Sequence, residues 1–238
     1  MGYQNVFKRY EIKYLITKEQ QALIKDKMSG YMDRDEYGKS SICNIYLDTP
    51  NYLLIRRSIE KPVYKEKLRL RSYGTAASDS MVFLELKKKY KGVVYKRRVG
   101  LQEDEAMKYL SGRGSIPDSQ IARELDYFMG QYEGLRPAAI ISYDREAFYE
   151  KGNRDFRLTF DENILWRDYD LSLCKGFYGA SILDKGQVLM EVKTGMAMPL
   201  WLTGLLSEQG IYHTSFSKYG NAYKEIITNR QSGGIYCA

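Results

Sequence analysis

Charged and apolar side chains alternate along several stretches of the chain, most clearly in the stretch 65–73. Cations occupy every second position there, at Lys65, Lys67, Arg69 and Arg71. Successive side chains of a β-strand point to opposite faces, so the four cations would share one face while Leu68 and Leu70 lie on the other. The pattern therefore predicts a strand with one charged face and one apolar face.

The same alternation returns in two later stretches. Phe83, Glu85, Lys87 and Lys89 form one period-two set, Glu191 and Lys193 form another, and each set lies opposite an apolar set. Such faces could each contact bulk water, or the strands could curl so that their charged faces enclose a polar interior. We favour the second interpretation because the arrangement recurs in several strands.

The remaining pattern predicts alternating strands and helices. Further strands are expected at 7–16, 41–49, 93–101, 138–150 and 155–164, with a hairpin at 182–192 that turns at 184–186. Helices are expected at 18–28 after Thr17 as N-cap, at 101–110, 118–132 and 199–207, and within 215–228, with a short helix or turn at 52–60 and a polar loop at 33–39. This order predicts one α+β domain over 1–230 and a C-terminal tail at 231–238. Its antiparallel β-barrel would be closed or nearly closed, with helices packed outside and inserted between strands.

Composition adds a modest positive charge to this picture. The 238 residues are 44% apolar, enough for a sizeable core, and 37 basic against 30 acidic residues give a net charge of +7. If the cations gather in one place, their field would attract a polyanion.

Cysteine spacing and apolar runs indicate the setting. Cys43, Cys174 and Cys237 lie far apart without CxxC spacing, which argues against a disulfide framework or a structural zinc site. The N-terminus lacks the apolar core of a signal peptide, and no run approaches the ~20 apolar residues that span a bilayer. We therefore expect a soluble, cytoplasmic protein without a membrane segment of its own.

A series of short motifs resembles the VTC domain, the polyphosphate polymerase domain of the vacuolar transporter chaperone family. This family lies within the triphosphate tunnel metalloenzyme (CYTH) superfamily. Each motif alone is unspecific, but seven occur in order over nearly the whole chain. They are Glu11 to Tyr14, Leu68 to Tyr73, Glu85 to Lys87, Tyr143 to Arg145, Arg157 to Asp161, Met190 to Lys193 and Ser217 to Tyr219.

The resemblance implies a fold, an activity and a set of site residues. The fold is an antiparallel β-tunnel, and the activity is metal-dependent transfer of the ATP γ-phosphoryl group to a growing polyphosphate chain. Glu191 would hold Mn²⁺ or Mg²⁺, and Arg69, Arg71, Lys87 and Glu191 are the expected catalytic residues. The implied phosphate ligands are Lys13, Arg69, Arg71, Lys87, Arg145, Arg157, Lys193, Ser217 and Lys218.

Departures from the family pattern favour the polymerase branch. Hydrolytic members of the superfamily open with ExExK, whereas Arg9, Glu11 and Lys13 stand at those places here. Ser215 replaces a basic residue expected in the eukaryotic polymerase. The chain also lacks the regulatory SPX domain and membrane segments of the eukaryotic complex, so it looks like a free-standing bacterial member, with a membrane partner as one possibility.

Several alternatives stay open at this stage. The same residues would serve a hydrolase of tripolyphosphate or nucleoside triphosphates, or a non-catalytic module that binds polyphosphate or nucleotide; no RNP-like motif points to nucleic acid. Glu191 could instead form a structural salt bridge with Lys193 or an arginine. The sequence does not decide which of Lys96, Arg97 and Arg98 face the tunnel, and it does not give the oligomeric state. Lys65 and Lys67 are expected at the tunnel mouth, and His213 and the cysteines are expected to be structural.

Overall fold

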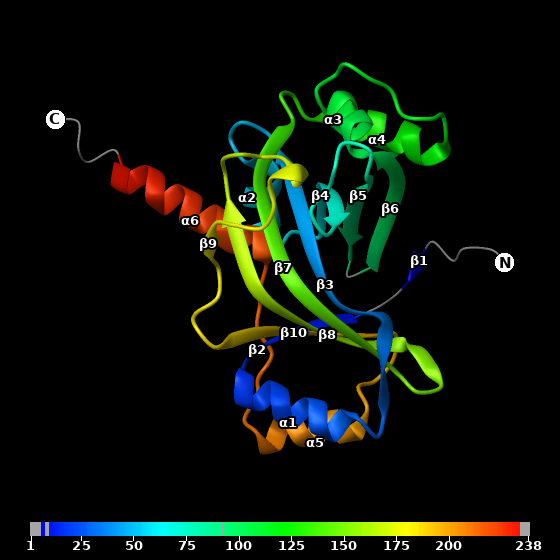
Figure 1. Ribbon diagram of the computed structural model, residues 1–238, viewed down its shortest axis with the longest axis vertical. Coiled ribbons are helices and arrows are strands. Elements are labelled where there is room, and N and C mark those ends of the chain that lie inside the picture. Colours follow the sequence, from blue (N-terminus) through cyan, green and yellow to red (C-terminus); the bar gives the residue numbers. More distant parts are fainter. Residues whose placement is uncertain (1–5, 8–9, 92, 234–238) are drawn as a thin grey trace.

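The computed structural model describes residues 6–7, 10–91 and 93–233, and most of them belong to one antiparallel sheet or pack against it (Figure 1). Its strand order is β1-β6-β5-β4-β3-β7-β8-β10-β2, and β9 pairs with β8 off this path. The strands are β1 (Val6–Phe7), β2 (Tyr10–Thr17), β3 (Met32–Asp48), β4 (Tyr64–Tyr73), β5 (Met81–Tyr90), β6 (Val93–Gln102), β7 (Arg136–Glu150), β8 (Asn153–Arg167), β9 (Ala180–Ser181) and β10 (Gln187–Thr194).

The two ends of this sheet are formed by neighbouring parts of the chain. β1 pairs with β6 at one end, and β2, the next strand along the chain, pairs with β10 at the other. The sheet is therefore strongly curved, although β1 and β2, as far as their residues are described, do not pair with each other to close it. The predicted α+β architecture with a nearly closed antiparallel sheet is confirmed.

Helices pack on the curved sheet in three groups, the first two on its outer face and the third on its inner face (Figure 1). α1 (Lys18–Met28) and α5 (Leu200–Glu208) lie side by side and pack on β2, β8 and β10. α3 (Glu103–Leu110) and α4 (Gln120–Gln131) cover β4 to β6, and α2 (Leu53–Ile59) packs with α6 (Lys218–Gly233) against β7 and β8. A short 3₁₀ helix, Leu173–Lys175, lies in the connection before β9. None of the described helices is long and apolar enough to cross a membrane.

Packing of the outer face decides which side chains point inward. Leu68 and Leu70 of β4 and Leu84 of β5 are completely buried in the core beneath α3 and α4. Because neighbouring positions of a strand point to opposite faces, this burial turns Lys67, Arg69 and their partners toward the inside of the curve. The predicted polar interior is confirmed.

The structure corrects three predicted elements. The polar loop expected at 33–39 belongs to β3, whose first residues pair with the end of β7 across an irregularity between Arg34 and Lys39. The hairpin expected at 182–192 was wrong, since β9 pairs with β8 while β10 pairs with β2 and β8. The single first strand is two strands, β1 and β2.

Backbone pairing explains the first two corrections, because a strand held in a large sheet needs no apolar pattern of its own. α6 ends at Gly233, inside the expected tail. Arg9, Cys237 and the rest of the tail lie outside the described residues.

Candidate functional site

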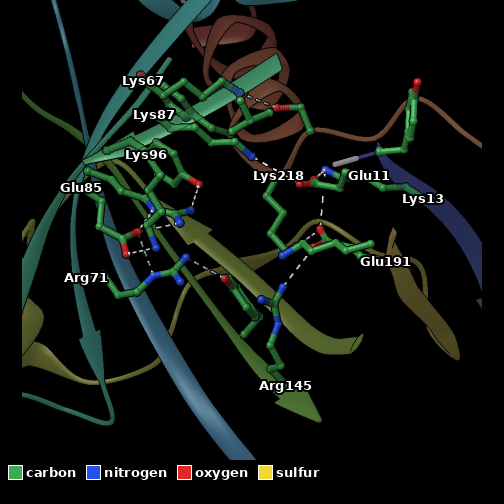
Figure 2. Close-up of a pocket in the computed structure, with 18 residues that line it drawn as sticks. Glu11, Lys13, Lys67, Arg71, Glu85, Lys87, Lys96, Arg145, Glu191 and Lys218 are labelled. Atoms are coloured by element: carbon green, nitrogen blue, oxygen red, sulfur yellow. Dashed lines mark hydrogen bonds and ion pairs between the residues drawn. The ribbon is translucent and has the colours of Figure 1, made fainter. Parts of the chain in front are cut away.

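A cavity of about 520 Å³ occupies the inside of the curved sheet (Figure 2). Seven strands, β2 to β7 and β10, contribute to its wall together with the start of α6. Nine lysine and arginine side chains line it, against three glutamates. The charged lining residues are Lys13, Lys67, Arg69, Arg71, Lys87, Lys96, Arg145, Lys193, Lys218, Glu11, Glu85 and Glu191.

The cavity brings together nine of the ten residues expected at the site. They are Lys13, Arg69, Arg71, Lys87, Arg145, Glu191, Lys193, Ser217 and Lys218. Arg157 does not line it. Its position shares the inner face with Lys193, directly opposite on β10, but its side chain is exposed and donates to the carbonyl of Arg154 at 3.3 Å.

One half of the cavity is built around the buried carboxylate of Glu85, in a set that we call the Glu85 cluster. The Nη2 atom of Arg69 lies 2.8 Å from the carboxylate, and Nζ of Lys96 lies 2.6 Å from it. The Nε atoms of Arg98 and Arg71 lie 3.5 and 3.8 Å from the same carboxylate. Burial raises the pKa of Glu85, but the nearby cations, chiefly Arg69, Arg71 and Lys96, lower it more, so that the pKa lies far below its usual range.

The Glu85 cluster also decides the parity of the basic run in β6. Lys96 and Arg98 face inward to Glu85, whereas Arg97 faces outward and pairs with Glu124 of α4 at 3.0 Å. The sequence left this open because no apolar residue within the run marks the outer face.

Neutral side chains that the sequence prediction missed orient the two arginines of β4. Nε of Arg71 donates to Oδ1 of Asn44 at 2.8 Å, and its Nη2 donates to the hydroxyl of Tyr143 at 3.2 Å. Nη1 of Arg69 donates to the hydroxyl of Tyr46 at 3.3 Å. Asn44 and Tyr46 alternate in β3 directly opposite Arg71 and Arg69, so strand pairing would have identified them. Fixed guanidinium groups bind anions with less loss of side-chain freedom.

The other half of the cavity surrounds Glu191 (Figure 2), whose cations also contact the buried Asp161; we call this set the Glu191 cluster. Arg145 binds Asp161 through two hydrogen bonds of 2.6 Å and lies 3.3 Å from Glu191. Nζ of Lys218 lies 3.0 Å from Glu191 and 2.5 Å from Asp161, and Lys13 lies 3.6 Å from Glu191. Glu191 is therefore paired mainly with groups other than Lys193, its neighbour along β10.

These cations control the ionisation of the Glu191 cluster. Burial raises the pKa of Glu191, but Lys218, Lys13 and Arg145 outweigh it, so that the pKa lies well below its ordinary value. In Tyr143, burial likewise raises the pKa, while Arg71, Arg145 and Lys218 lower it to about 8. The cavity thus stabilises negative charge wherever a group can carry it.

Contacts at the start of α6 and β2 complete the wall. Nζ of Lys67 donates to Oγ of Ser217 at 3.1 Å, and Oγ of Ser217 accepts from the amide of Gly220 at 3.1 Å. Glu11 of β2 lies 3.3 Å from Lys13 and 3.3 Å from Lys87. The contact with Lys87 connects β2 to β5 across the open side of the sheet. Lys67 thus lies in the cavity itself, whereas Lys65 does not line it.

Lys67 is expected to take up a proton when an anion binds. Burial and the cations Lys13 and Lys87 lower its pKa to about 7, so above that pH most of the free protein carries a neutral Lys67. A bound polyanion would raise this pKa, and binding would weaken as the pH rises through and above about 7. Calorimetric titration of tripolyphosphate at about pH 8, in buffers with different ionisation enthalpies, measures the uptake.

Lys67→Met should remove up to one proton from this uptake. Lys88→Met, on the outer face of β5, should not change it. Equal uptake by wild type and Lys67→Met would contradict the assignment.

Glu11 and Glu191 are the acidic residues available for a metal in the cavity. Among the described residues, no group of three or more His, Cys, Asp and Glu side chains could hold a metal ion. The two glutamates lie on adjacent strands, and their oxygens suit Mg²⁺ or Mn²⁺. Mg²⁺ is commonly held by one or two carboxylates together with substrate phosphates. The donor set therefore fits a cation shared with a phosphate ligand, and it does not fit one held by the protein alone.

Comparison with known proteins identifies the family. The VTC domain profile matches residues 8–227. The chain belongs to the VTC domain family. No curated protein matches this VTC-domain chain.

Two solved structures share the fold of this VTC domain. A candidate adenylate cyclase of Bacillus halodurans has 15% identity and a TM-score of 0.56, with 90% of this chain and 96% of that chain covered. A candidate adenylyl cyclase of Hippeastrum, in which triphosphatase activity dominates, has 18% identity and a TM-score of 0.52, with 88% and 92% covered. At these identities the likeness establishes the triphosphate tunnel fold alone.

Proposed function

We propose that this VTC domain is a polyphosphate polymerase, which transfers the γ-phosphoryl group of ATP to the end of a growing inorganic polyphosphate chain inside the cavity. The observation that carries the proposal is the surplus of nine lysine and arginine side chains over three glutamates in one cavity of a VTC-family chain. Such a focused positive field favours a ligand with several negative charges. ATP and polyphosphate are the partners in this proposal, and the cytoplasm is its setting.

Phosphoryl transfer asks the protein mainly to position the reactants and to stabilise charge on phosphate oxygens. Arg69, Arg71 and Arg145 can each bind two oxygens, and Lys218 and the hydroxyl of Ser217 can bind others. The acceptor, a terminal phosphate, is already an anion and needs no general base. This suits a cavity whose glutamates are paired with cations and are therefore weak bases.

Glu191, with Glu11 beside it, would hold Mn²⁺ or Mg²⁺ in this proposal. When bound, the ion would supply positive charge between phosphate oxygens. Glu191 would then have to exchange part of its pairing with Lys218, Lys13 and Arg145 for the ion. A phosphate chain could take over those cations at the same time.

Hydrolysis of tripolyphosphate or nucleoside triphosphates is the second candidate, favoured by the dominant triphosphatase activity of the Hippeastrum protein. The same cations would bind its substrate. Attack by water, however, benefits from a proton acceptor, and the three lining glutamates all lie within ion-pair distance of lysine or arginine. We therefore rank polymerisation first.

The deciding experiment incubates purified protein with ATP, Mn²⁺ or Mg²⁺ and a short polyphosphate primer, and separates the products by chain length. Long chains are expected, and Arg69→Ala should reduce their rate of formation by about 100-fold because the guanidinium positions phosphate oxygens. Arg123→Ala, on the exposed surface of α4, is the matched control and should keep the wild-type rate. Release of phosphate or pyrophosphate without chain growth would identify a hydrolase, and binding without turnover would identify a binding module.

A further inference from the structure

The inner faces of β4 and β5 change in character along their length. Arg69 faces Glu85 directly across the two strands. The next inward pairs are Lys67 with Lys87 and then Lys65 with Lys89, so two successive cross-strand pairs consist of lysines alone. Like charges directly opposite one another destabilise a sheet.

Nearby carboxylates balance only part of this charge. Lys87 pairs with Glu11 at 3.3 Å. Within the described part of the chain, Lys65, Lys67 and Lys89 form no ion pair with a carboxylate; Lys65 reaches only the carbonyl of Ser58, at 3.5 Å. Burial and then Lys89, Lys87, Lys13 and Lys61 lower the pKa of Lys65, which shows that these amines share one field.

The opposite end of the same faces has a different composition. Phe83 faces Gly100 of β6 there, and the guanidinium carbon of Arg98 lies 3.4 Å from the Phe83 ring centroid. Arg98 also lies beside the ring of Tyr73, and its Nε lies 3.5 Å from the carboxylate of Glu85. Cations at this end are thus covered by rings or paired with a carboxylate, and the unbalanced positive charge lies at the lysine end alone.

We propose that Lys65 and Lys89, which we call the lysine track, bind the part of a phosphate chain that extends beyond the cavity. This inference rests on the proposed polyphosphate chemistry and names the end of the cavity where a long chain lies. Lys65 and Lys89 are the next inward positions after Lys67 and Lys87, about 6.6–6.8 Å further along β4 and β5, so the track continues the lysines of the cavity wall along a linear polyanion. Lys67 and Lys87 connect the track to the cavity, since both line its wall.

The test compares the dissociation constants of tripolyphosphate and of long-chain polyphosphate for the intact protein and two double variants. Lys65→Ala/Lys89→Ala removes both track residues. Lys88→Ala/Lys175→Ala removes the same charge from the outer face of β5 and from the exposed 3₁₀ turn before β9. The track variant should bind long chains roughly tenfold more weakly and with a shallower salt dependence. Its affinity for tripolyphosphate should stay within about twofold of wild type, which also verifies folding.

Two results with the double variants would overturn the track. One is equal loss of long-chain affinity in both double variants, and the other is wild-type affinity for long chains in the track variant. If the wild-type protein binds tripolyphosphate but gains nothing from a longer chain, the track fails while the proposed function stands. If it binds no tripolyphosphate, the proposed function fails as well.

Discussion

Glu191→Gln is expected to lower the rate of polyphosphate synthesis by roughly two to three orders of magnitude without weakening tripolyphosphate binding. The carboxylate is the proposed metal ligand, and it lies among Lys218, Lys13 and Arg145. Removing its charge leaves these cations unbalanced, so the cavity should attract a polyanion at least as strongly as before. Steady-state rates and calorimetric affinities measure the two effects separately.

Glu146→Gln is the matched control for this experiment. Glu146 pairs with Arg34 and Lys25 outside the cavity, so the same change of charge there should leave synthesis intact. A Glu191→Gln variant that keeps its rate would exclude a catalytic role for the carboxylate. Parallel loss of rate and of tripolyphosphate affinity would instead indicate that Glu191 only maintains the shape of the cavity.

Glu85→Gln is expected to cost about 3 kcal/mol of unfolding free energy, or roughly 6–12 °C in the melting temperature. The buried carboxylate is the shared partner of Arg69, Arg71, Lys96 and Arg98. Removing one partner of a buried ion pair costs about 3–5 kcal/mol. We expect the lower value because the side chains of Lys96 and Arg98 are 46% and 33% exposed and stay partly solvated. Thermal and denaturant unfolding measure the loss.

Tripolyphosphate should raise the melting temperature of Glu85→Gln more than that of wild type, because the anion replaces the missing charge. Glu124→Gln is the control, since Glu124 pairs with Arg97 on the outer face and should cost at most about 1 kcal/mol. Equal losses in the two variants would show that Glu85 contributes no more than a surface ion pair.

The alternation of charged and apolar residues was sufficient to predict the strands whose apolar face packs against helices. In β4 and β5 the apolar set lies beneath helices, so the pattern gave both the strands and the face that points inward. The start of β3 escaped prediction because its residues are polar and largely exposed, and its strand geometry comes from pairing with β7. The false hairpin at 182–192 arose from a turn sequence that joins two strands, β9 and β10, which both pair with β8 and not with each other.

The site was predictable as a set of charges but not as a network. Motif positions identified most of the cavity lining, but Arg157, which was included through the same resemblance, does not line the cavity and donates to the carbonyl of Arg154 instead. Tyr46 and Asn44 were missed because their role depends on which strand lies beside β4. Sequence parity gives the face of a strand, and only the sheet order gives the partner.

The placement of β1 and β2 at opposite ends of the sheet determines when the cavity can be assembled during synthesis. β2 is made before β3 to β9, yet it pairs with β10, so Lys13 meets Glu191 and the carbonyl of Phe216 only after these later segments have been synthesised. Until then Lys13 lacks its partner Glu191, whereas Arg69 and Lys96 can already pair with Glu85, which is close to them along the chain. Contacts so distant along the chain are slow to form. The complete cavity is therefore assembled only after the start of α6 has been synthesised, because Lys218 there also pairs with Glu191.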